Sequence, residues 1–394
     1  MRRLECLFCQ KKYPLDVFNP FCPQCGEPMV VAYPRRKRTM ALECPLSLEK
    51  YRDFLPLASI DRKISLAEGN TPLVPLYRVM NNHHLPLVLA KNETVNPTHS
   101  FKDRGTAVAV QKAVSLGIKK IGTVSTGNMA ASTAAYGAKA GLRTFVFFKE
   151  GSSPEKILST GIHGATLFQV KGDYGELFRK SFEIGRKEHI YFMNSVDPMR
   201  IEGYKVTAYE IFIGLERRAP RFVFVPVSSA GHLVGLIRGF QDLKDEGFIR
   251  QIPIFVGVQA KGCSPLSRAF SQGKDRFQRI FKAQTIAHAI SNPDPPAGNL
   301  ALKLIREVGG LLMDVTDQEI LTAQRELAER EGILADPASA TTLAGLIKLS
   351  GKTRLVWGVI VLIITGSGLK TMESLKKQRI RLKRISLQNK VGSP

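Results

Sequence analysis

Short apolar segments alternate with stretches of helical pattern along most of this 394-residue chain. Alternation of this kind predicts βαβ units, in which helices join parallel strands. The expected strands are residues 85–90, 121–124, 144–148, 165–170, 190–193, 222–227, 254–258 and 356–364. They form one series before residue 200 and another after it. The expected fold is therefore α/β, with two open twisted parallel-sheet domains and a ligand site between them.

Lys102 stands where the apolar segment 85–90 gives way, through turn-forming residues, to an Ala- and Val-rich helical pattern. Ser100 and Asp103 are expected to cap that helix, which places Lys102 at a strand-to-helix junction. The positive end of the helix dipole and partial burial both disfavour the charged ammonium group. Because only a neutral amine attacks a carbonyl, this position suits a Schiff-base lysine. The alternative is a solvated lysine on a first helical turn.

Two Cys-x-x-Cys pairs near the amino terminus are separated by twelve residues: Cys6, Cys9, Cys22 and Cys25. Four thiolates at this spacing can bind zinc tetrahedrally, and residues 1–33 are too few to bury a core otherwise. We expect a structural zinc ribbon, since four cysteines leave no open position for a substrate. The alternative is four reduced cysteines in a loose tail. Disulfides are less expected in a chain without a secretory segment.

Three later loops combine hydroxyls, small residues or arginine with the start of an expected helix. Ser125-Thr126-Gly127-Asn128 offers hydroxyls and helix-start amides to a carboxylate or another anion, although one of these residues would suffice as an ordinary cap. Arg200 follows Asn194 and Ser195 and can bind a phosphate through two parallel hydrogen bonds; alone, it would be read as a surface ion pair. The small residues of 228–232 let backbone amides approach a phosphate closely.

The formal net charge is +23, and much of it lies in the run 35–38 and in the tail from Lys370, which holds eight basic residues against Glu373 alone. Such charge attracts nucleic acid or phosphorylated metabolites, or it forms a solvated surface. The longest apolar run, near 359–364, indicates a buried strand rather than a membrane span. With no secretory segment after Met1, we expect a cytoplasmic protein.

The stretch 96–105, Asn-Pro-Thr-His-Ser-Phe-Lys-Asp-Arg-Gly, resembles the lysine motif of fold-type II pyridoxal-phosphate (PLP) enzymes. It is most similar to the threonine synthase family, with His99 in place of a glycine. Some members of that family, and cysteate synthase, carry a similar cysteine-rich extension. The further segments that resemble the family are 68–73, 125–128, 194–203, 228–232, 336–340 and 365–370. The resemblance thus extends over about 64–370.

This resemblance implies that Lys102 binds PLP covalently and later transfers protons, with Thr365 beside the ring nitrogen. The implied cofactor-binding residues are Lys102, Asn128, Ser228, Ser229, Ala230, Gly231, His232 and Thr365. The implied substrate ligands are Ser125 and Thr126 for a carboxylate and Asn194, Ser195 and Arg200 for a phosphate. Asp103 and Arg104 are assigned to structure, and a homodimer is implied. Outside the resemblance, Thr365 would be a strand-end turn.

The reaction implied by the resemblance is that of a lyase, which converts O-phosphohomoserine and water to threonine and phosphate. Three departures from the family pattern leave a second substrate open: His99, Met129 in place of the usual threonine, and His232 in place of the usual asparagine. That substrate is O-phosphoserine with sulfite, as in cysteate synthase. A non-catalytic zinc-ribbon protein that binds nucleic acid is the third alternative. The expected units are a ribbon (1–33), a linker and lead-in (34–63), a catalytic region (64–375) with a small domain (about 91–215) inserted in a large one, and a basic tail (376–394).

Overall fold

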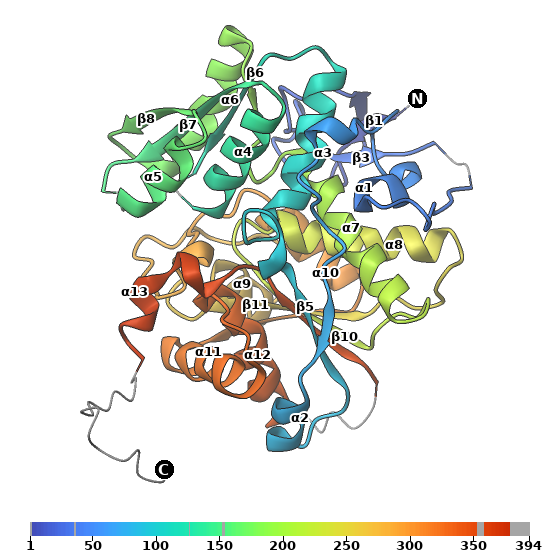
Figure 1. Ribbon diagram of the computed structural model, residues 1–394, viewed down its shortest axis with the longest axis vertical. Coiled ribbons are helices and arrows are strands. Elements are labelled where there is room, and N and C mark those ends of the chain that lie inside the picture. Colours follow the sequence, from blue (N-terminus) through green and yellow to red (C-terminus); the bar gives the residue numbers. More distant parts are fainter. Residues whose placement is uncertain (1, 35–36, 126, 152–153, 353–357, 379–394) are drawn as a thin grey trace, which may run out of the picture.

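The computed structural model describes residues 2–34, 37–125, 127–151, 154–352 and 358–378 (Figure 1). Within these ranges the strands form three sheets. The larger sheet has the strand order β12-β11-β10-β13-β5-β4, and the smaller sheet has the order β8-β7-β6-β9. The third sheet, near the amino terminus, has the order β2-β1-β3. The strands are β1 (Arg3–Glu5), β2 (Lys12–Pro14), β3 (Val30–Ala32), β4 (Leu73–Pro75), β5 (Val88–Asn92), β6 (Lys120–Val124), β7 (Arg143–Lys149), β8 (Thr166–Val170), β9 (Tyr191–Phe192), β10 (Phe222–Pro226), β11 (Ile254–Ala260), β12 (Leu311–Val315) and β13 (Ile360–Ile364).

Helices connect the strands from β3 onward, and α13 follows the last strand. They are α1 (Ser47–Lys50), α2 (Tyr77–His83), α3 (Lys102–Ser115), α4 (Asn128–Lys139), α5 (Pro154–Gly161), α6 (Tyr174–Glu188), α7 (Pro198–Gly214), α8 (Gly231–Asp245), α9 (Pro265–Ser271), α10 (Gly298–Glu307), α11 (Asp317–Glu331), α12 (Pro337–Ser350) and α13 (Met372–Leu375). Figure 1 draws the smaller sheet above the larger one, with the amino-terminal segment, in blue, to the right of the smaller sheet.

The central strands of the larger sheet are buried on both faces. Along β10, Val223 and Val225 belong to one hydrophobic cluster and Phe224 belongs to another, as the two-residue period of a strand requires. All five residues of β13 are buried, which is typical of a central parallel strand. The α/β prediction is confirmed here.

Two details of the larger sheet differ from the prediction. The edge strand β4 pairs antiparallel with β5, whereas a wholly parallel sheet was expected. Neither β4, which is only three residues long, nor β12, in which an aspartate interrupts the apolar residues, was predicted from the apolar pattern. Of the predicted strand 356–364, residues 356 and 357 lie outside the described part of the chain, and β13 begins at Ile360.

The smaller sheet is parallel throughout. Its strands lie within or close to the segments predicted from the apolar pattern, although β9 has only two residues. In the chain these strands fall between β5 and β10, so the smaller sheet is an insertion between strands of the larger one.

Helices α3, α7 and α8 cross in close contact, and glycines allow it. A Cβ on Gly105 of α3 would lie 2.6 Å from the Tyr204 ring of α7. A Cβ on Gly235 of α8 would lie 2.7 Å from Cβ of the same tyrosine, and one on Gly203 would meet the carbonyl group of Arg104. The starts of these three helices are therefore fixed relative to one another.

The amino-terminal segments pack into the main core. Leu4, Val31 and Phe54 are buried in the same hydrophobic cluster as residues of α7 and α8. The prediction for the basic run 35–38, a solvated or ligand-attracting surface, is wrong at Arg38. The Arg38 side chain is buried and pairs with Asp242 of α8 (2.9 Å) and with Glu246, which directly follows α8 (2.6 Å).

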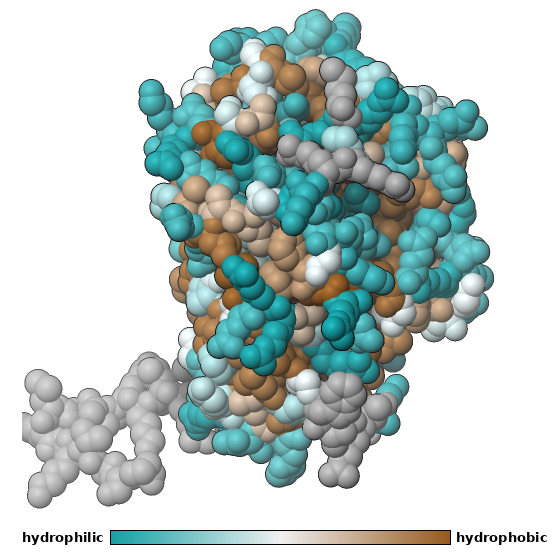
Figure 2. Space-filling model, turned by 90° about the vertical axis from the view of Figure 1, so that its right-hand side faces the viewer, coloured by the Kyte–Doolittle hydropathy of each residue, from teal (hydrophilic) through white to brown (hydrophobic). Residues whose placement is uncertain are grey.

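No helix in the described residues combines the length and the apolar character that crossing a bilayer requires. Figure 2 shows one face of the molecule, on which hydrophobic residues form a broken band through the middle, interrupted by hydrophilic side chains.

Candidate active site

Lys102 is the first residue of α3, as predicted for a strand-to-helix junction. The predicted caps are wrong. No side chain caps α3, because Asp103 reaches back and accepts hydrogen bonds from the backbone N–H (2.6 Å) and hydroxyl (2.5 Å) of Thr98. Ser100 Oγ is buried and has no hydrogen-bond partner among the described residues. Asp103 thus closes the turn before the helix.

The lysine loop is attached to the end of β13. The Phe101 N–H donates to the Thr365 carbonyl (3.0 Å), and Ser100 forms an antiparallel bridge with Gly366. A Cβ on Gly366 would lie 3.2 Å from Nδ2 of Asn128, at the start of α4. The fold therefore gathers three predicted cofactor residues, Lys102, Asn128 and Thr365. The Thr365 hydroxyl lies 2.9 Å from that of Ser339.

Two non-glycine residues near the site have left-handed backbone conformations. His99 has a φ of 58°, and Ala230, which precedes α8, has a φ of 69°. Such a conformation costs an L-residue roughly 1 kcal/mol relative to glycine. His99 therefore keeps the backbone conformation that the glycine of the resembling motif adopts easily.

The amine of Lys102 is placed where the charged form is disfavoured. Its Nζ lies 4.3 Å from the ring centre of Phe101 and 5.8 Å from that of Tyr204, contacts that would by themselves favour the ammonium form. Burial, together with the positive charge of Arg200, lowers the pKa of Lys102 to about 7. A substantial fraction of the amine is therefore neutral at neutral pH, as a nucleophilic lysine requires.

Arg200, in the first turn of α7, is completely buried. Its guanidinium donates to the Met193 carbonyl and to the hydroxyls of Thr106 (2.8 Å) and Thr133 (2.6 Å). No described residue places a carboxylate within ion-pair distance of it. These three hydrogen-bond partners are neutral oxygens, so the guanidinium is suited to receive an anion.

Asn194 and Ser195 lie between β9 and α7. The Asn194 side chain accepts a hydrogen bond from the Val124 N–H (2.8 Å) and donates to Ser181 (2.9 Å), so it joins the ends of β6 and β9. Ser195 approaches the start of α8, where a Cβ on Gly231 would lie 2.5 Å from its carbonyl oxygen. The structure thus brings Ser195 to the 228–232 loop, while the Asn194 amide supports the backbone.

The loop 228–232 links β10 to α8. The Ser229 hydroxyl accepts a hydrogen bond from Asn292 (2.9 Å), and α8 begins at Gly231 without a side-chain cap. Its first backbone N–H groups therefore remain available to an anion.

His232 occupies the first turn of α8 and is 6% exposed. Its ring stacks on Phe101 with the ring centres 4.0 Å apart, and neither ring nitrogen has a hydrogen-bond partner in the described part of the chain. Burial and the charges of Lys102 and Arg104 hold the pKa of His232 well below its usual range. The imidazole is therefore neutral, with one nitrogen able to donate.

The remaining predicted ligands follow β6. The Ser125 hydroxyl accepts a hydrogen bond from the Gly127 N–H (3.2 Å), and Thr126 lies outside the described residues. Met129 is buried in the first turn of α4.

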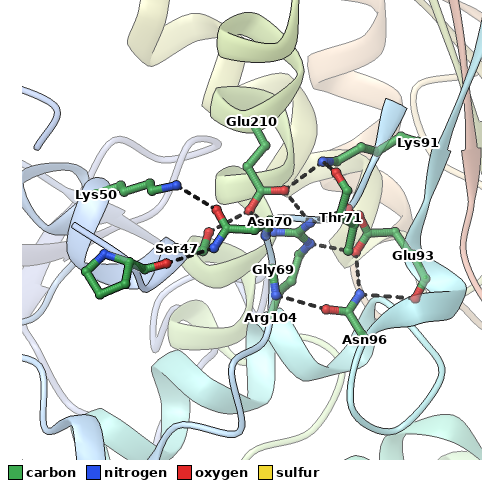
Figure 3. A network of polar contacts seen from close by, with 11 residues as sticks. Ser47, Lys50, Gly69, Asn70, Thr71, Lys91, Glu93, Asn96, Arg104 and Glu210 are labelled. Carbon is green, nitrogen blue, oxygen red and sulfur yellow. Dashed lines mark hydrogen bonds and ion pairs between the residues drawn. The ribbon is translucent and has the colours of Figure 1, made fainter. Parts of the chain in front are cut away.

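Sequence reasoning missed a buried ionic network beneath the lysine loop (Figure 3). Arg104 donates to Glu93 (2.6 Å) and Glu210 (2.7 Å), and Lys91 also pairs with Glu210 (2.7 Å). All four side chains are buried, so Arg104 is part of the ionic packing between β5, α3 and α7. The available signal was the presence of Lys91 and Glu93 at the end of an otherwise apolar strand.

The four predicted zinc ligands come together. The sulfur atoms of Cys6, Cys9, Cys22 and Cys25 all lie within 4.8 Å of one another, with Cys6 and Cys25 3.4 Å apart and Cys9 and Cys22 3.5 Å apart. This arrangement matches a four-coordinate site with thiolate ligands.

The class of protein follows from the fold and the lysine together. Residues 64–366 match the family described as pyridoxal-phosphate dependent enzyme. Two solved structures show the same fold. A serine racemase from Dictyostelium discoideum has a TM-score of 0.66 at 21% identity, with 78% of this chain and 95% of that chain covered. Processed threonine deaminase isoform 2 from Solanum lycopersicum has a TM-score of 0.68 at 18% identity, with 79% and 87% covered.

Comparison with curated relatives narrows the class of PLP-dependent enzyme. The threonine synthase of Methanocaldococcus jannaschii is 35% identical over 93% of this chain and 92% of its own. The threonine synthase of Methanosarcina acetivorans is 35% identical over 89% of this chain and 87% of its own. That of Halalkalibacterium halodurans is 37% identical over 82% of this chain and 89% of its own. The chain belongs to the threonine synthase family of PLP-dependent enzymes. The M. jannaschii match covers 93% of this chain, which is more than residues 64–394 alone can supply. The match therefore also includes part of the segment before residue 64.

Proposed function

We propose that this enzyme converts O-phosphohomoserine and water to threonine and phosphate, with PLP bound to Lys102. The observation that carries the proposal is the buried guanidinium of Arg200, which has no carboxylate partner among the described residues and lies near enough to Lys102 to lower its pKa. An amine-reactive cofactor and a phosphorylated substrate together satisfy these two groups.

Several features of this chain fit PLP. The uncapped start of α8 after Ser228 and Ser229 suits the cofactor phosphate. His232 and Ser100 each have buried polar atoms without partners among the described residues, which a phosphate or ring substituent can engage. Thr365 offers a neutral hydroxyl, a partner that leaves the ring nitrogen unprotonated.

When bound, PLP supplies an electron sink for negative charge at the substrate α-carbon. The neutral Nζ of Lys102 removes the α-proton and returns a proton later in the reaction. Arg200, with Asn194 and Ser195, binds the substrate phosphate and orients it as a leaving group. Ser125 and Thr126 bind the substrate carboxylate.

The proposed metal is zinc, bound by Cys6, Cys9, Cys22 and Cys25, and the clustering of their sulfur atoms supports this. Metal analysis of the purified protein is expected to give about one zinc per chain. A homodimer, a cytoplasmic location and the domain boundaries given above remain proposals; light scattering in solution tests the dimer.

The deciding experiment has two parts. Protein with added PLP is expected to show a visible absorption band that Lys102→Ala abolishes. Phosphate release is then measured from O-phosphohomoserine, and from O-phosphoserine with sulfite. Release only from O-phosphoserine would move the assignment to a cysteate synthase activity, an outcome that the buried Met129 makes worth testing. Release from neither substrate by PLP-loaded protein would overturn the proposed function.

A further inference from the structure

The amino-terminal ribbon (residues 2–33) packs against the segment that leads to Arg200. The Phe18 ring meets the Tyr191 ring edge-on, with centres 6.3 Å apart. The Tyr191 hydroxyl donates to Asp197 (2.7 Å), and the other carboxylate oxygen of Asp197 accepts from the Arg200 backbone N–H (2.9 Å). A short series of contacts therefore joins the ribbon to the cap of α7.

A second series of contacts reaches α7 two residues after Arg200. The Tyr33 hydroxyl contacts the carboxylate of Glu202, which is fully buried. Lys205 pairs with Glu202 (2.7 Å) and with Asp242 of α8 (2.6 Å). Tyr33, which directly follows β3, thus contributes to the packing of α7 against α8.

The ribbon also contacts helices that pack beside each of the two sheets. Phe21 packs on Phe182 of α6, beside the smaller sheet, with ring centres 5.5 Å apart. Glu27 accepts a hydrogen bond from Asn299 of α10 (3.0 Å), and Arg238 of α8 donates to the Val31 carbonyl (2.9 Å). The ribbon therefore spans the region between the two sheets on the side where α7 begins.

We propose that the metal-bound ribbon is a positioning element for the substrate phosphate, which holds residues 194–202 so that Arg200 meets its ligand. This rests on the proposed function, in which Arg200 binds that phosphate. The strands of the ribbon are only three residues each, so its shape depends on the metal, and loss of the metal would release Phe18 and Tyr33. Phe18 and Tyr33 are positioning residues, because they act through Tyr191, Asp197 and Glu202.

The test compares Phe18→Leu and Tyr33→Phe with a control in the same ribbon. Lys12→Ala removes only an exposed ion pair with Glu5 (3.7 Å). Holoenzyme is titrated with inorganic phosphate by calorimetry, and PLP affinity is measured by absorbance. Each positioning variant is expected to bind phosphate about three- to tenfold more weakly, with PLP affinity unchanged. The control is expected to match wild type in both measurements.

A second arm removes the metal. Chelator treatment of the holoenzyme is expected to weaken phosphate binding, and added zinc to restore it in wild type but not in Cys22→Ser. Unchanged phosphate affinity in both positioning variants, or a parallel loss of PLP affinity, would overturn the proposal. An enzyme inactive on O-phosphohomoserine whose variants still bind phosphate more weakly would instead sink the proposed function alone.

Discussion

At the scale of single residues, the site depends on two cations placed near each other. Lys102 gives up its charge readily, whereas a guanidinium does not lose its proton in this pH range. The charge of Arg200 therefore favours the neutral amine of Lys102 and is also suited to bind an anion. One buried guanidinium would serve both the cofactor and the substrate.

The first prediction concerns the pH dependence of PLP capture. Because burial and Arg200 lower the pKa of Lys102 to about 7, capture by the apoprotein is expected to slow as the pH falls below about 7 and to level off above it. Arg200→Met removes the nearby charge, so the midpoint is expected to move to higher pH. Stopped-flow absorbance measures both curves. A midpoint that stays the same in the variant would contradict this role of Arg200.

The second prediction concerns the left-handed backbone of Ala230. Ala230→Gly relieves steric strain and is expected to raise the free energy of unfolding by up to about 1 kcal/mol and to tighten PLP binding. Ala328→Gly, within α11, is the matched control and is expected to lose about 1 kcal/mol. Chemical denaturation measures both. Equal losses in the two variants would show that Ala230 is not strained.

Single residues also show what the sequence can predict. The position of Lys102 follows from local turn and helix signals, so it was predicted. The burial of Arg38 was not, because its partners Asp242 and Glu246 lie more than 200 residues away in the chain. The same limit applies to His232. Its ring nitrogens lack hydrogen-bond partners among the described residues because the ring stacks on Phe101, which is distant in the chain.

At the scale of elements, the lysine loop is supported by the network of Lys91, Glu93, Arg104 and Glu210, which joins β5, α3 and α7. Burial opposes ionisation of Glu210, yet the charges of Arg104 and Lys91 hold the pKa of that carboxyl well below its usual range. Folding is therefore stabilised by this group above about pH 4.5, and the stabilisation is lost as the pH falls below that value.

The third prediction follows from this network. Glu210→Gln leaves Lys91 and Arg104 undercompensated, and is expected to cost about 3 to 5 kcal/mol at pH 7. The variant is also expected to lose less stability than wild type between pH 5 and pH 3, because it lacks the titrating carboxylate. Glu307→Gln, which removes a half-exposed pair with Lys303, is the control and is expected to change stability by less than about 1 kcal/mol. A uniform acid sensitivity in all three proteins would contradict the prediction.

Prediction of the elements succeeded where the pattern is local. The smaller sheet follows apolar segments separated by helical stretches, and its strands were predicted to within a few residues. The antiparallel pairing of β4 was missed, since three residues carry no periodicity and the pairing depends on where β5 lies. The way in which α3, α7 and α8 approach one another was likewise not visible from the composition of each helix.

At the scale of the whole molecule, the ribbon shares its hydrophobic core with the catalytic region. Cys6 and Cys22 belong to the same cluster as Ile201, Val225 and Leu236. The segment proposed to bind zinc is thus continuous with the core beside the active site, and the two are expected to unfold together.

The fourth prediction is that metal removal lowers the melting temperature of the protein as a whole. A single calorimetric transition is expected both with and without chelator, shifted to lower temperature when the metal is absent. An unchanged main transition beside a separate small one would show that the ribbon unfolds independently.

The glycine contacts between α3, α7 and α8 have a consequence for how members of this family can diverge. Positions such as Gly105, Gly203 and Gly235 accept no side chain without separating the helices, so the frame that carries Lys102, Arg200 and His232 resists change. A new substrate specificity must then come from substitutions at side chains that these helices place in the site, such as His232 and Met129. A directed-evolution library aimed at a new substrate should vary those positions and leave the glycines intact.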